Sequence, residues 1–396
     1  MRNIIIKKII ISSVLVLFFF SGNAQKITMN QGNTAQKNYY TEIPFEYVNS
    51  KIIIPVVIQN KTYRFLLDTG APNCITQRLK KELNTTLIKQ LPVTDANDNK
   101  SIMDIIALPE LSIGGITFQN TMALAYKEQK NLVFDCFEID GFIGSNLLRN
   151  SILQIDIKNK LIRITNDLKK VAINKNDVAK VSLLGNQSSP FIWIKINGRK
   201  AAKEQVLLDT GMKGFYDLSN RAYNIFKNKT EIKVLSTGNG SNSLSLFENT
   251  KSSDQLRLLV PEITISKTKF NAITTTTTDD KNSRIGIDLL EYGIGTLDYQ
   301  NKKFYFSAYS DTNNLSEVLQ PFSPTILNNK LSVGIVWDEK LKDEITTGDE
   351  ILEMNDINYE QYAICDLIAK PSIFKDIIIK ELVVKKSDGT IRKVSL

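Results

Sequence analysis

The chain has 396 residues, with 50 lysine and arginine residues against 42 aspartate and glutamate residues, and it contains no histidine. The absence of histidine excludes Ser-His-Asp and Cys-His nucleophilic mechanisms and argues against a usual zinc hydrolase site, which leaves carboxylates or a lysine base for hydrolysis. The formal charge of +8 is mild for this length. No basic stripe with interleaved aromatic residues occurs, so nucleic acid is not an expected partner.

Residues 1–24 have the composition of a signal peptide. Basic residues precede an apolar run at 9–20, and the segment closes on small residues. A membrane anchor is the alternative, but this run is shorter than the roughly 20 residues needed to span a bilayer, so no stable membrane span is expected. We predict export to the periplasm or beyond. The polar residues 25–42 predict a flexible lead-in, with a cleavable pro-segment as the alternative.

From residue 43 the pattern favours strands. Apolar runs at 52–58 and 63–67 flank turn-forming residues and predict a hairpin whose second strand delivers Asp68. Thr76 is positioned to cap a short helix over 78–83.

A second segment follows the same plan. Strands are expected at 191–196 and 205–208, the latter leading into Asp209, and a short helix is expected at 220–226. Residues 186–190, with those just before them, are the expected connection between the two segments. Turn-forming residues predict flap hairpins near 95–99 and 238–243, and the threonine run 274–278 predicts an edge strand.

These two segments form an internal repeat. The sequence Leu-Leu-Asp-Thr-Gly occurs twice, and its aspartates, Asp68 and Asp209, lie 141 positions apart. An acid at the end of an apolar strand is costly to bury unless it is paired or used chemically, so two of them suggest one site built from two halves. Pairs with nearly the same spacing are Gly144 with Gly286 and residues 154–160 with 296–302.

This ordered pattern resembles the aspartic protease family, and within it the retropepsin-like branch, over about residues 45–308. Retroviral members carry one such unit and dimerise, whereas pepsin-like members carry two units in one chain. The resemblance implies a mainly β, bilobal aspartic protease fold built from two tandem retropepsin-like β lobes. We expect an N-terminal lobe at 43–172 and a C-terminal lobe at 173–308.

The resemblance also assigns roles to the repeated motif. Asp68 and Asp209 would face each other across a pseudo-twofold axis, share one proton and activate a water molecule held between them. In such a pair, two like charges at close range force the two carboxyl pKa values apart, and the pair titrates as a unit. No cofactor or metal is implied. The residues expected to support the pair are Thr69, Gly70, Thr210 and Gly211.

The residue after each glycine departs from the pepsin-like pattern. Pepsin-like enzymes have serine or threonine there, and this chain has Ala71 and Met212. The loss of hydroxyl donors to the charged form should raise the carboxyl pKa values, so we expect a pH optimum nearer neutrality than that of pepsin. Met212 is also bulky enough to crowd the site.

The three cysteines are Cys74, Cys136 and Cys365. An odd number leaves at least one thiol unpaired in an exported protein. A bridge between Cys74 and Cys136 within the first lobe and buried free thiols are both consistent with the sequence.

Residues 316–396 have a different character. The segment 347–356 resembles the Gly-Asp-x-Ile-x-x-Ile-Asn signature of bacterial PDZ domains, with strands expected at 331–337 and in a terminal hairpin, and a helix at 359–369. PDZ domains bind peptide C-termini by strand addition. Here Pro324 stands in place of a glycine-rich carboxylate loop and lacks an amide donor, so docking onto the lobes is the equal alternative to peptide binding.

The sequence therefore predicts an exported aspartic endopeptidase acting on a peptide or protein substrate, with a small α+β PDZ-like domain. The alternative from another class is an inactive peptide-binding or scaffold protein that uses the same cleft and the PDZ-like domain.

Overall fold

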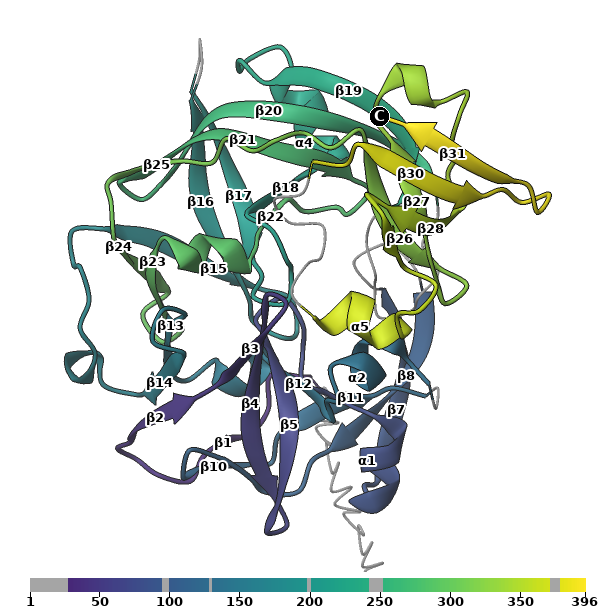
Figure 1. Cartoon of the computed structure of the whole chain (residues 1–396). Coiled ribbons are helices and arrows are strands. Elements are labelled where there is room, and N and C mark those ends of the chain that lie inside the picture. The colour runs from purple at the N-terminus through teal and green to yellow at the C-terminus, as the bar shows by residue number, and fades with distance from the viewer. Residues whose placement is uncertain (1–27, 95–99, 128–129, 198–200, 242–251, 371–377) are drawn as a thin grey trace, which may run out of the picture.

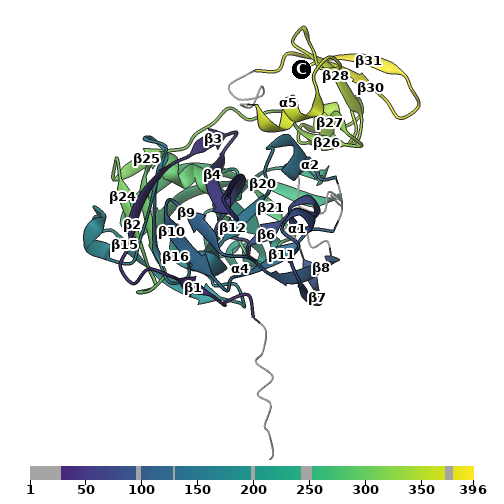
Figure 2. The same cartoon turned by 90° about the horizontal axis from the view of Figure 1, so that it is seen from below.

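The computed structural model describes residues 28–94, 100–127, 130–197, 201–241, 252–370 and 378–396. The described residues are mainly β, as predicted, and form two lobes joined by a shared sheet, with a smaller C-terminal domain on one side (Figures 1 and 2). The predicted signal peptide at 1–24 lies outside them.

The first lobe contains one large sheet in which β4 and β5 form the predicted hairpin. Gln59 and Asn60 make its two-residue turn in the left-handed region, with φ values of 50° and 62°. Thr76 caps α1 as predicted, because its side chain accepts a hydrogen bond from the backbone N–H of Leu79. The strands are β1 Asn33–Thr34, β3 Glu46–Val48, β4 Lys51–Ile58, β5 Lys61–Asp68, β6 Cys74–Ile75, β7 Leu87–Thr94, β8 Lys100–Ala107, β9 Leu111–Ile113, β10 Ile116–Gln119, β11 Met122–Ala125 and β12 Gly141–Gly144. The helices are α1 Gln77–Glu82, α2 Leu132–Cys136 and α3 Ser145–Leu148.

The second lobe repeats this plan with a hairpin of β16 and β17 followed by a helix, α4, at the predicted residues. Long antiparallel strands β19, β20 and β21 extend it. Its strands are β16 Ser189–Asn197, β17 Ala202–Leu208, β18 Tyr216–Ser219, β19 Lys233–Gly240, β20 Ser253–Ile265, β21 Thr268–Thr278, β22 Arg284–Ile285 and β25 Thr312–Asn314. Its helices are α4 Asn220–Phe226 and the 3-10 helix η2 Ile287–Glu291.

The lobes share a sheet whose strands pair in the order β2, β14, β13, β23, β24, β15. Its central pairing sets Gln154 opposite Thr296, which are each other's counterparts in the sequence repeat, so the pseudo-twofold axis passes between them. The Gln154 amide donates to the Thr296 hydroxyl at 2.8 Å. The bounds are β2 Tyr40–Pro44, β13 Ile152–Asp156, β14 Leu161–Thr165, β15 Val178–Leu184, β23 Gly293–Asp298 and β24 Lys303–Ala308, with the 3-10 helix η1 Leu168–Lys170 between β14 and β15.

This sheet corrects two expectations about the connections. The end of the predicted lead-in at 25–42 belongs to β2, because β2 adds to the edge of β14. The predicted inter-lobe connection at 186–190 is instead the turn between β15 and β16 and the start of β16. Both errors arise because the outer strands pair with residues distant in sequence, and the segment that leaves β14 through η1 makes the connection.

The threonine run 274–278 was predicted to be an edge strand, and that prediction is wrong. Within β21, Thr274 pairs with β20 on one side, while Thr277 and Thr278 pair with β18 in parallel register. The Thr275 hydroxyl is buried and donates to the Tyr216 carbonyl at 2.6 Å. The run therefore lies inside the sheet of the second lobe.

The predicted flap regions correspond to two hairpins. β7 and β8 are the arms around 95–99, and this predicted tip lies outside the described residues. In the second lobe Gly238 lies within β19 rather than at a tip, because β19 pairs with β20 through Gly240.

The C-terminal domain has a core of its own that includes Phe322, Val333 and Leu382. The strand expected at 331–337 corresponds to β27, while the expected helix at 359–369 is shorter, at α5. The elements are β26 Phe322–Leu327, β27 Lys330–Val336, η3 Glu339–Leu341, β28 Glu350–Met354, β29 Ile357–Asn358, α5 Ile364–Ala369, β30 Glu381–Lys385 and β31 Ile391–Ser395.

This domain is docked onto both lobes. On the second lobe, β27 pairs with β19 at Ile335 and Gly240, and the Arg257 guanidinium lies 4.5 Å from the centre of the Trp337 ring. On the first lobe, Asn49 donates to the carbonyl of Ile368 in α5 at 2.6 Å. The docking alternative from the sequence analysis thus describes the observed arrangement.

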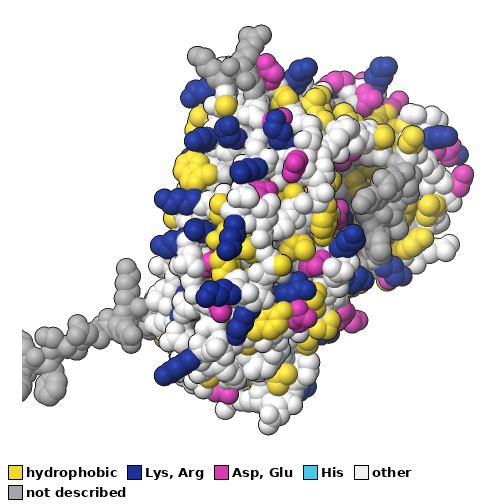
Figure 3. Space-filling model, turned by 90° about the vertical axis from the view of Figure 1, so that its left-hand side faces the viewer, with side chains coloured by type: hydrophobic (Ala, Val, Ile, Leu, Met, Phe, Trp, Pro, Cys, Tyr) yellow, Lys and Arg dark blue, Asp and Glu magenta, His cyan; other side chains and the backbone are white. Residues whose placement is uncertain are grey.

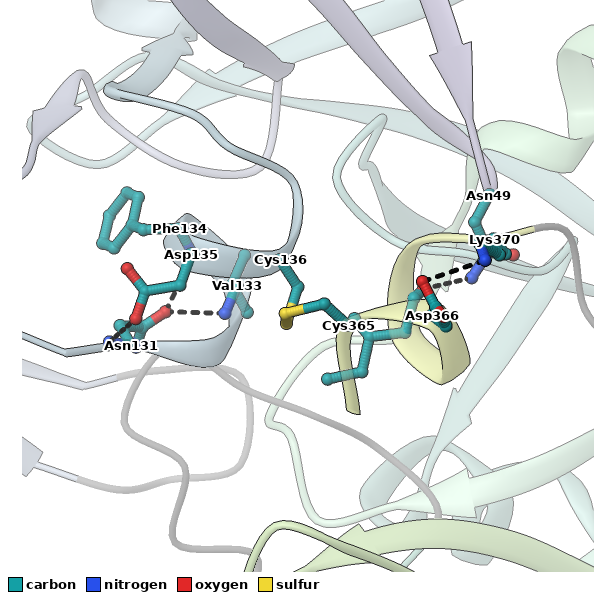
Figure 4. The surroundings of a disulfide bond; sticks show 10 residues. Asn49, Asn131, Val133, Phe134, Asp135, Cys136, Cys365, Asp366 and Lys370 are labelled. Carbon is teal, nitrogen blue, oxygen red and sulfur yellow. Dashed lines mark hydrogen bonds and ion pairs between the residues drawn. A yellow bond between two sulfur atoms is a disulfide. The ribbon is translucent and has the colours of Figure 1, made fainter. Parts of the chain in front are cut away.

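A disulfide between Cys136 in α2 and Cys365 in α5 fastens this contact covalently (Figure 4). Neither sequence expectation for Cys136 is correct: it is not free, and its partner is not Cys74. Cys74 lies in β6 as a buried free thiol. The bridge spans 229 residues, so local spacing gave no signal for it.

The face that carries the shared sheet displays many lysine and arginine side chains, with acidic and apolar ones between them (Figure 3). Lys180 on β15 and Lys303 on β24 are among the exposed residues. None of the helices in the described part of the chain has the length and hydrophobicity needed to cross a membrane.

Candidate active site

Each Asp-Thr-Gly motif lies at the end of a strand that pairs with a parallel strand from later in the same lobe. β12 runs parallel to β5 and sets Gly144 opposite Asp68. In the second lobe β22 runs parallel to β17, and the Asp209 amide donates to the Ile285 carbonyl at 2.9 Å. Both aspartates therefore leave their strands at equivalent places.

The repeated glycines are required by the loop that follows each aspartate. A Cβ on Gly144 would lie 2.2 Å from the Ala71 carbonyl oxygen, and one on Gly286 would lie 2.3 Å from that of Gly214. Such distances are far below van der Waals contact, so only glycine lets the loop pass over the strand. The same requirement for glycine in both lobes explains why these two positions match in the sequence repeat.

The two threonines form a reciprocal hydrogen-bonded clamp between the lobes. The Thr69 amide donates to the Thr210 hydroxyl at 3.0 Å, and the Thr210 amide donates to the Thr69 hydroxyl at 3.1 Å. The hydroxyls in turn donate to carbonyls of the opposite lobe, that of Thr69 to Leu208 at 2.6 Å and that of Thr210 to Leu67 at 2.9 Å. Both side chains are almost fully buried, so all four bonds are shielded from water.

The clamp brings the two carboxyl groups together. Asp68 Oδ1 accepts from the amides of Gly70 and Ala71 at 2.9 and 3.0 Å, and Asp209 Oδ1 accepts from the Gly211 amide at 3.0 Å. A Cβ on Gly70 would lie 2.6 Å from the Asp209 Cγ, and one on Gly211 would lie 2.4 Å from the Asp68 Cγ. All six residues predicted for the site thus meet at the lobe junction.

The pKa of Asp68 is shifted in the direction expected from the sequence. Burial, and after it the negative charge of Asp209, raise the pKa of Asp68 to about 7. Lys51 and the Gly70 amide oppose this rise by stabilising the charged form. The sequence predicts a raised pKa from the missing hydroxyl donors, whereas the main cause in the structure is burial.

The two departures at Ala71 and Met212 have different consequences. The Ala71 amide reaches the carboxylate of its own lobe, but the Met212 amide donates to the backbone carbonyl of Asp209 at 3.3 Å instead. The Met212 side chain is buried, and its Cε lies 3.2 Å from the position that a Cβ on Gly286 would take. Met212 therefore packs beneath the second-lobe loop.

Sequence reasoning missed two cations at the site. The Lys51 ammonium donates to the Gly211 carbonyl, and the Arg284 Nη1 lies 3.8 Å from the Asp209 Oδ2. Strand register was the available signal for Lys51: because Ile53 pairs with Leu66, the residue two positions before it falls beside Asp68. It also missed that the Ser145 hydroxyl donates to the Thr69 carbonyl at 2.7 Å.

Residues 54–147 match the model of a family described as aspartyl protease, so the first lobe has the aspartic protease fold. This match supports a peptidase. It covers the motif at Asp68 and the glycine at Gly144, and it ends before the second lobe begins.

Among solved structures, the chain is similar to the crystal structure of the aspartic proteinase from Irpex lacteus. The identity is 12%, the TM-score is 0.43, and the alignment covers 69% of this chain and 98% of that one. No curated protein matches the chain.

Proposed function

We propose that the protein is an exported aspartic-type endopeptidase that hydrolyses peptide bonds with a water molecule activated by Asp68 and Asp209. The observation that carries this proposal is the approach of the two carboxyl groups, each against the glycine that follows the other. Asp209 is buried and Asp68 is partly buried, and two carboxyl groups this close cannot both ionise at low cost, so one proton is shared between them.

The shared proton gives the pair both functions that peptide hydrolysis needs. The ionised member takes a proton from the water, which attacks the scissile carbonyl carbon, while the protonated member donates a hydrogen bond to the carbonyl oxygen. The roles then reverse, so that the amine leaves protonated and the pair returns to its starting state. The threonine clamp keeps both carboxyl groups in place during this exchange.

The raised pKa of Asp68 supports activity at weakly acidic to neutral pH. To be active, the pair must lose one proton and keep the other, and burial raises the pKa of Asp68 to about 7. A pH–rate profile with its maximum below about pH 3 would contradict this part of the proposal.

Export is proposed from the basic, apolar and small residues of 1–24. Sequencing of the N-terminus of protein recovered from the periplasm or medium tests it. A new N-terminus at Gln25 is expected, and full-length protein retained in the cytoplasm would contradict export.

The C-terminal domain is proposed to be PDZ-like, with a peptide C-terminus as its candidate ligand beside β26. The observed docking favours a structural role as well, because β27 and α5 attach the domain to different lobes. Binding of C-terminal hexapeptides with free and amidated ends would separate the two roles: a requirement for the free carboxylate supports peptide capture.

The central experiment compares Asp68→Asn and Asp209→Asn with the unaltered protein on a peptide library from pH 3 to 8. Loss of cleavage in both variants, with unchanged circular dichroism, is expected. If the unaltered protein cleaves nothing and does not bind a pepstatin-like inhibitor, the alternative function as a peptide-binding or scaffold protein takes its place.

A further inference from the structure

The pseudo-twofold symmetry of the site is broken at the carbonyl groups of the two motif glycines. In the first lobe, Lys51 at the start of β4 reaches across to the second lobe, and its ammonium group donates a hydrogen bond to the Gly211 carbonyl. In the second lobe, the amide of Gln187 donates to the Gly70 carbonyl at 3.1 Å. The same backbone group thus receives a cation on one side and a neutral donor on the other.

Strand register shows that this difference is local. Ile53 pairs with Leu66 in the first lobe, and Phe191 pairs with Leu207 in the second, so Ser189 occupies the position equivalent to Lys51. The Ser189 hydroxyl accepts from Gln187 at 2.9 Å. A short polar pair in the second lobe therefore takes the place of the lysine.

A second cation breaks the symmetry in the opposite lobe. Arg284 lies two residues before Gly286, where the first lobe has Phe142 before Gly144. Its Nη1 lies 3.8 Å from Asp209 Oδ2, and its Nη2 forms an ion pair with Asp280. The arginine side chain is only 13% exposed, so these interactions are weakly screened by solvent.

The remaining charged and titratable groups around the pair are few. Asp217 on β18 lies opposite Arg284 on β22 in the strand register, and its charge interacts with Asp209. The groups that interact with Lys51 or with Asp68 are otherwise Lys213, Asp288, Cys74 and Tyr299. Lys51 contacts the motif residue Gly211 and Arg284 lies beside Asp209, so these two cations are placed to act on the pair.

We propose that Lys51 and Arg284 are positioning residues that hold the Asp68/Asp209 pair in its singly ionised form, Lys51 through the Gly211 loop and Arg284 beside Asp209. This inference rests on the proposed function. A cation near a carboxylate favours its charged form, and burial disfavours that form. Burial also lowers the pKa of Lys51, and the negative charges of Asp68 and Asp209 oppose this by favouring the ammonium. Lys51 limits how far burial raises the pKa of Asp68, and Arg284 places a positive charge beside Asp209, so one carboxylate stays available as the base.

The direct test is Lys51→Gln, which replaces the cation with the neutral donor that the other lobe uses. Both limbs of the pH–rate profile should move to higher pH by about 1 unit or more, because the charge of Lys51 lowers the pKa of Asp68 and a nearby opposite charge is worth about 1–3 units to a carboxyl group. Lys51→Arg should keep the unaltered profile. The matched control is Lys213→Gln, which removes a charge whose amine donates to Asn49.

Arg284→Phe gives the second lobe the residue of the first and should shift the profile in the same direction. Arg284→Lys, which keeps the charge, should show little of this shift. Thermal unfolding of each variant separates loss of fold from loss of charge, since a shifted pH profile is not a consequence of lowered stability.

A readout without substrate keeps this inference separate from the proposed function. The carboxyl carbons of ¹³C-labelled aspartate report the titration of the pair directly, with Asp68→Asn and Asp209→Asn to assign the signals. An upward shift of that titration in Lys51→Gln supports the inference even if the protein cleaves nothing. An unchanged titration in both Lys51→Gln and Arg284→Phe would overturn it.

Discussion

The two lobes have the same backbone geometry at equivalent turns. Asp156 accepts from the amide and side chain of Asn159 at 3.1 and 2.8 Å, and Asp298 does the same with Asn301 at 2.9 and 2.8 Å. These turns follow β13 and β23, the strands on either side of the pseudo-twofold axis. The repeat thus includes the turns that close the central strands of the shared sheet.

The charges around the site do not follow this repeat. Lys51 has Ser189 as its counterpart, and Arg284 has Phe142. The first lobe alone has a cysteine bonded to the C-terminal domain. The comparison teaches that the duplication preserves the geometry of the carboxyl pair, while each lobe adds its own electrostatic surroundings.

The threonine clamp is the shared feature with the largest expected effect. Thr69→Val would leave the Thr210 amide and the Leu208 carbonyl without partners in a buried setting. At about 1–3 kcal/mol for each unsatisfied group, the free energy of unfolding should fall by about 4 kcal/mol, and activity should fall at least about 100-fold. Chemical denaturation and peptide cleavage measure both effects.

Thr210→Val should match Thr69→Val, because the clamp is reciprocal. Thr69→Ser and Thr210→Ser keep the hydroxyls and are the matched controls. If one valine variant were harmless, the equivalence of the two halves of the clamp would be refuted.

The disulfide is a feature of the first lobe alone. Cys136→Ser should lower the free energy of unfolding by about 3 kcal/mol, since a bridge that closes a loop of 229 residues restrains the unfolded chain strongly. Differential scanning calorimetry should also show the C-terminal domain unfolding earlier than the lobes. Cys74→Ala is the control, and an equal loss of stability in that variant would argue against a special role for the bridge.

The pH dependence of stability follows from the pKa of Asp68. The folded value of about 7 lies above the ordinary value of 3.8, so between these pH values the folded state retains a proton that the unfolded state lacks. Stability should therefore fall as pH rises from about 4 to about 7. Denaturation across this range should show the slope in the unaltered protein and a smaller slope in Asp68→Asn, where Asp217, whose pKa burial raises to about 6, still contributes; equal slopes would refute the assignment.

The smallest expected effect concerns the residue after each glycine. Ala71→Ser adds a hydroxyl next to an amide that already donates to Asp68, so it should lower the carboxyl pKa and move the acid limb of the pH–rate profile down by less than about 1 unit. The same change at Met212 should do less for Asp209, because the Met212 amide faces a backbone carbonyl. An upward shift in Ala71→Ser would contradict the donor argument.

The sequence predicted the mainly β fold, the hairpins before Asp68 and Asp209, and the helices α1 and α4, because these depend on local patterns of apolar residues, turns and caps. The repeat also placed six residues at one junction. The sequence did not reveal the Cys136–Cys365 bridge, the strand at residues 40–42 or the interior position of residues 274–278, because each depends on partners far away in the chain. Lys51 was missed because a lysine that opens a strand reads as surface until the register of its neighbour is known.

The most direct test is the titration of the two carboxyl groups in ¹³C-aspartate-labelled protein, followed from pH 2 to 9. We predict two coupled steps that belong to Asp68 and Asp209 as a pair, with the upper step well above the ordinary range of an aspartate, and a single step for the remaining carboxyl when either residue is changed to asparagine. Two independent titrations near the ordinary value, each unaffected by replacement of the other residue, would contradict a shared proton and with it the proposed chemistry.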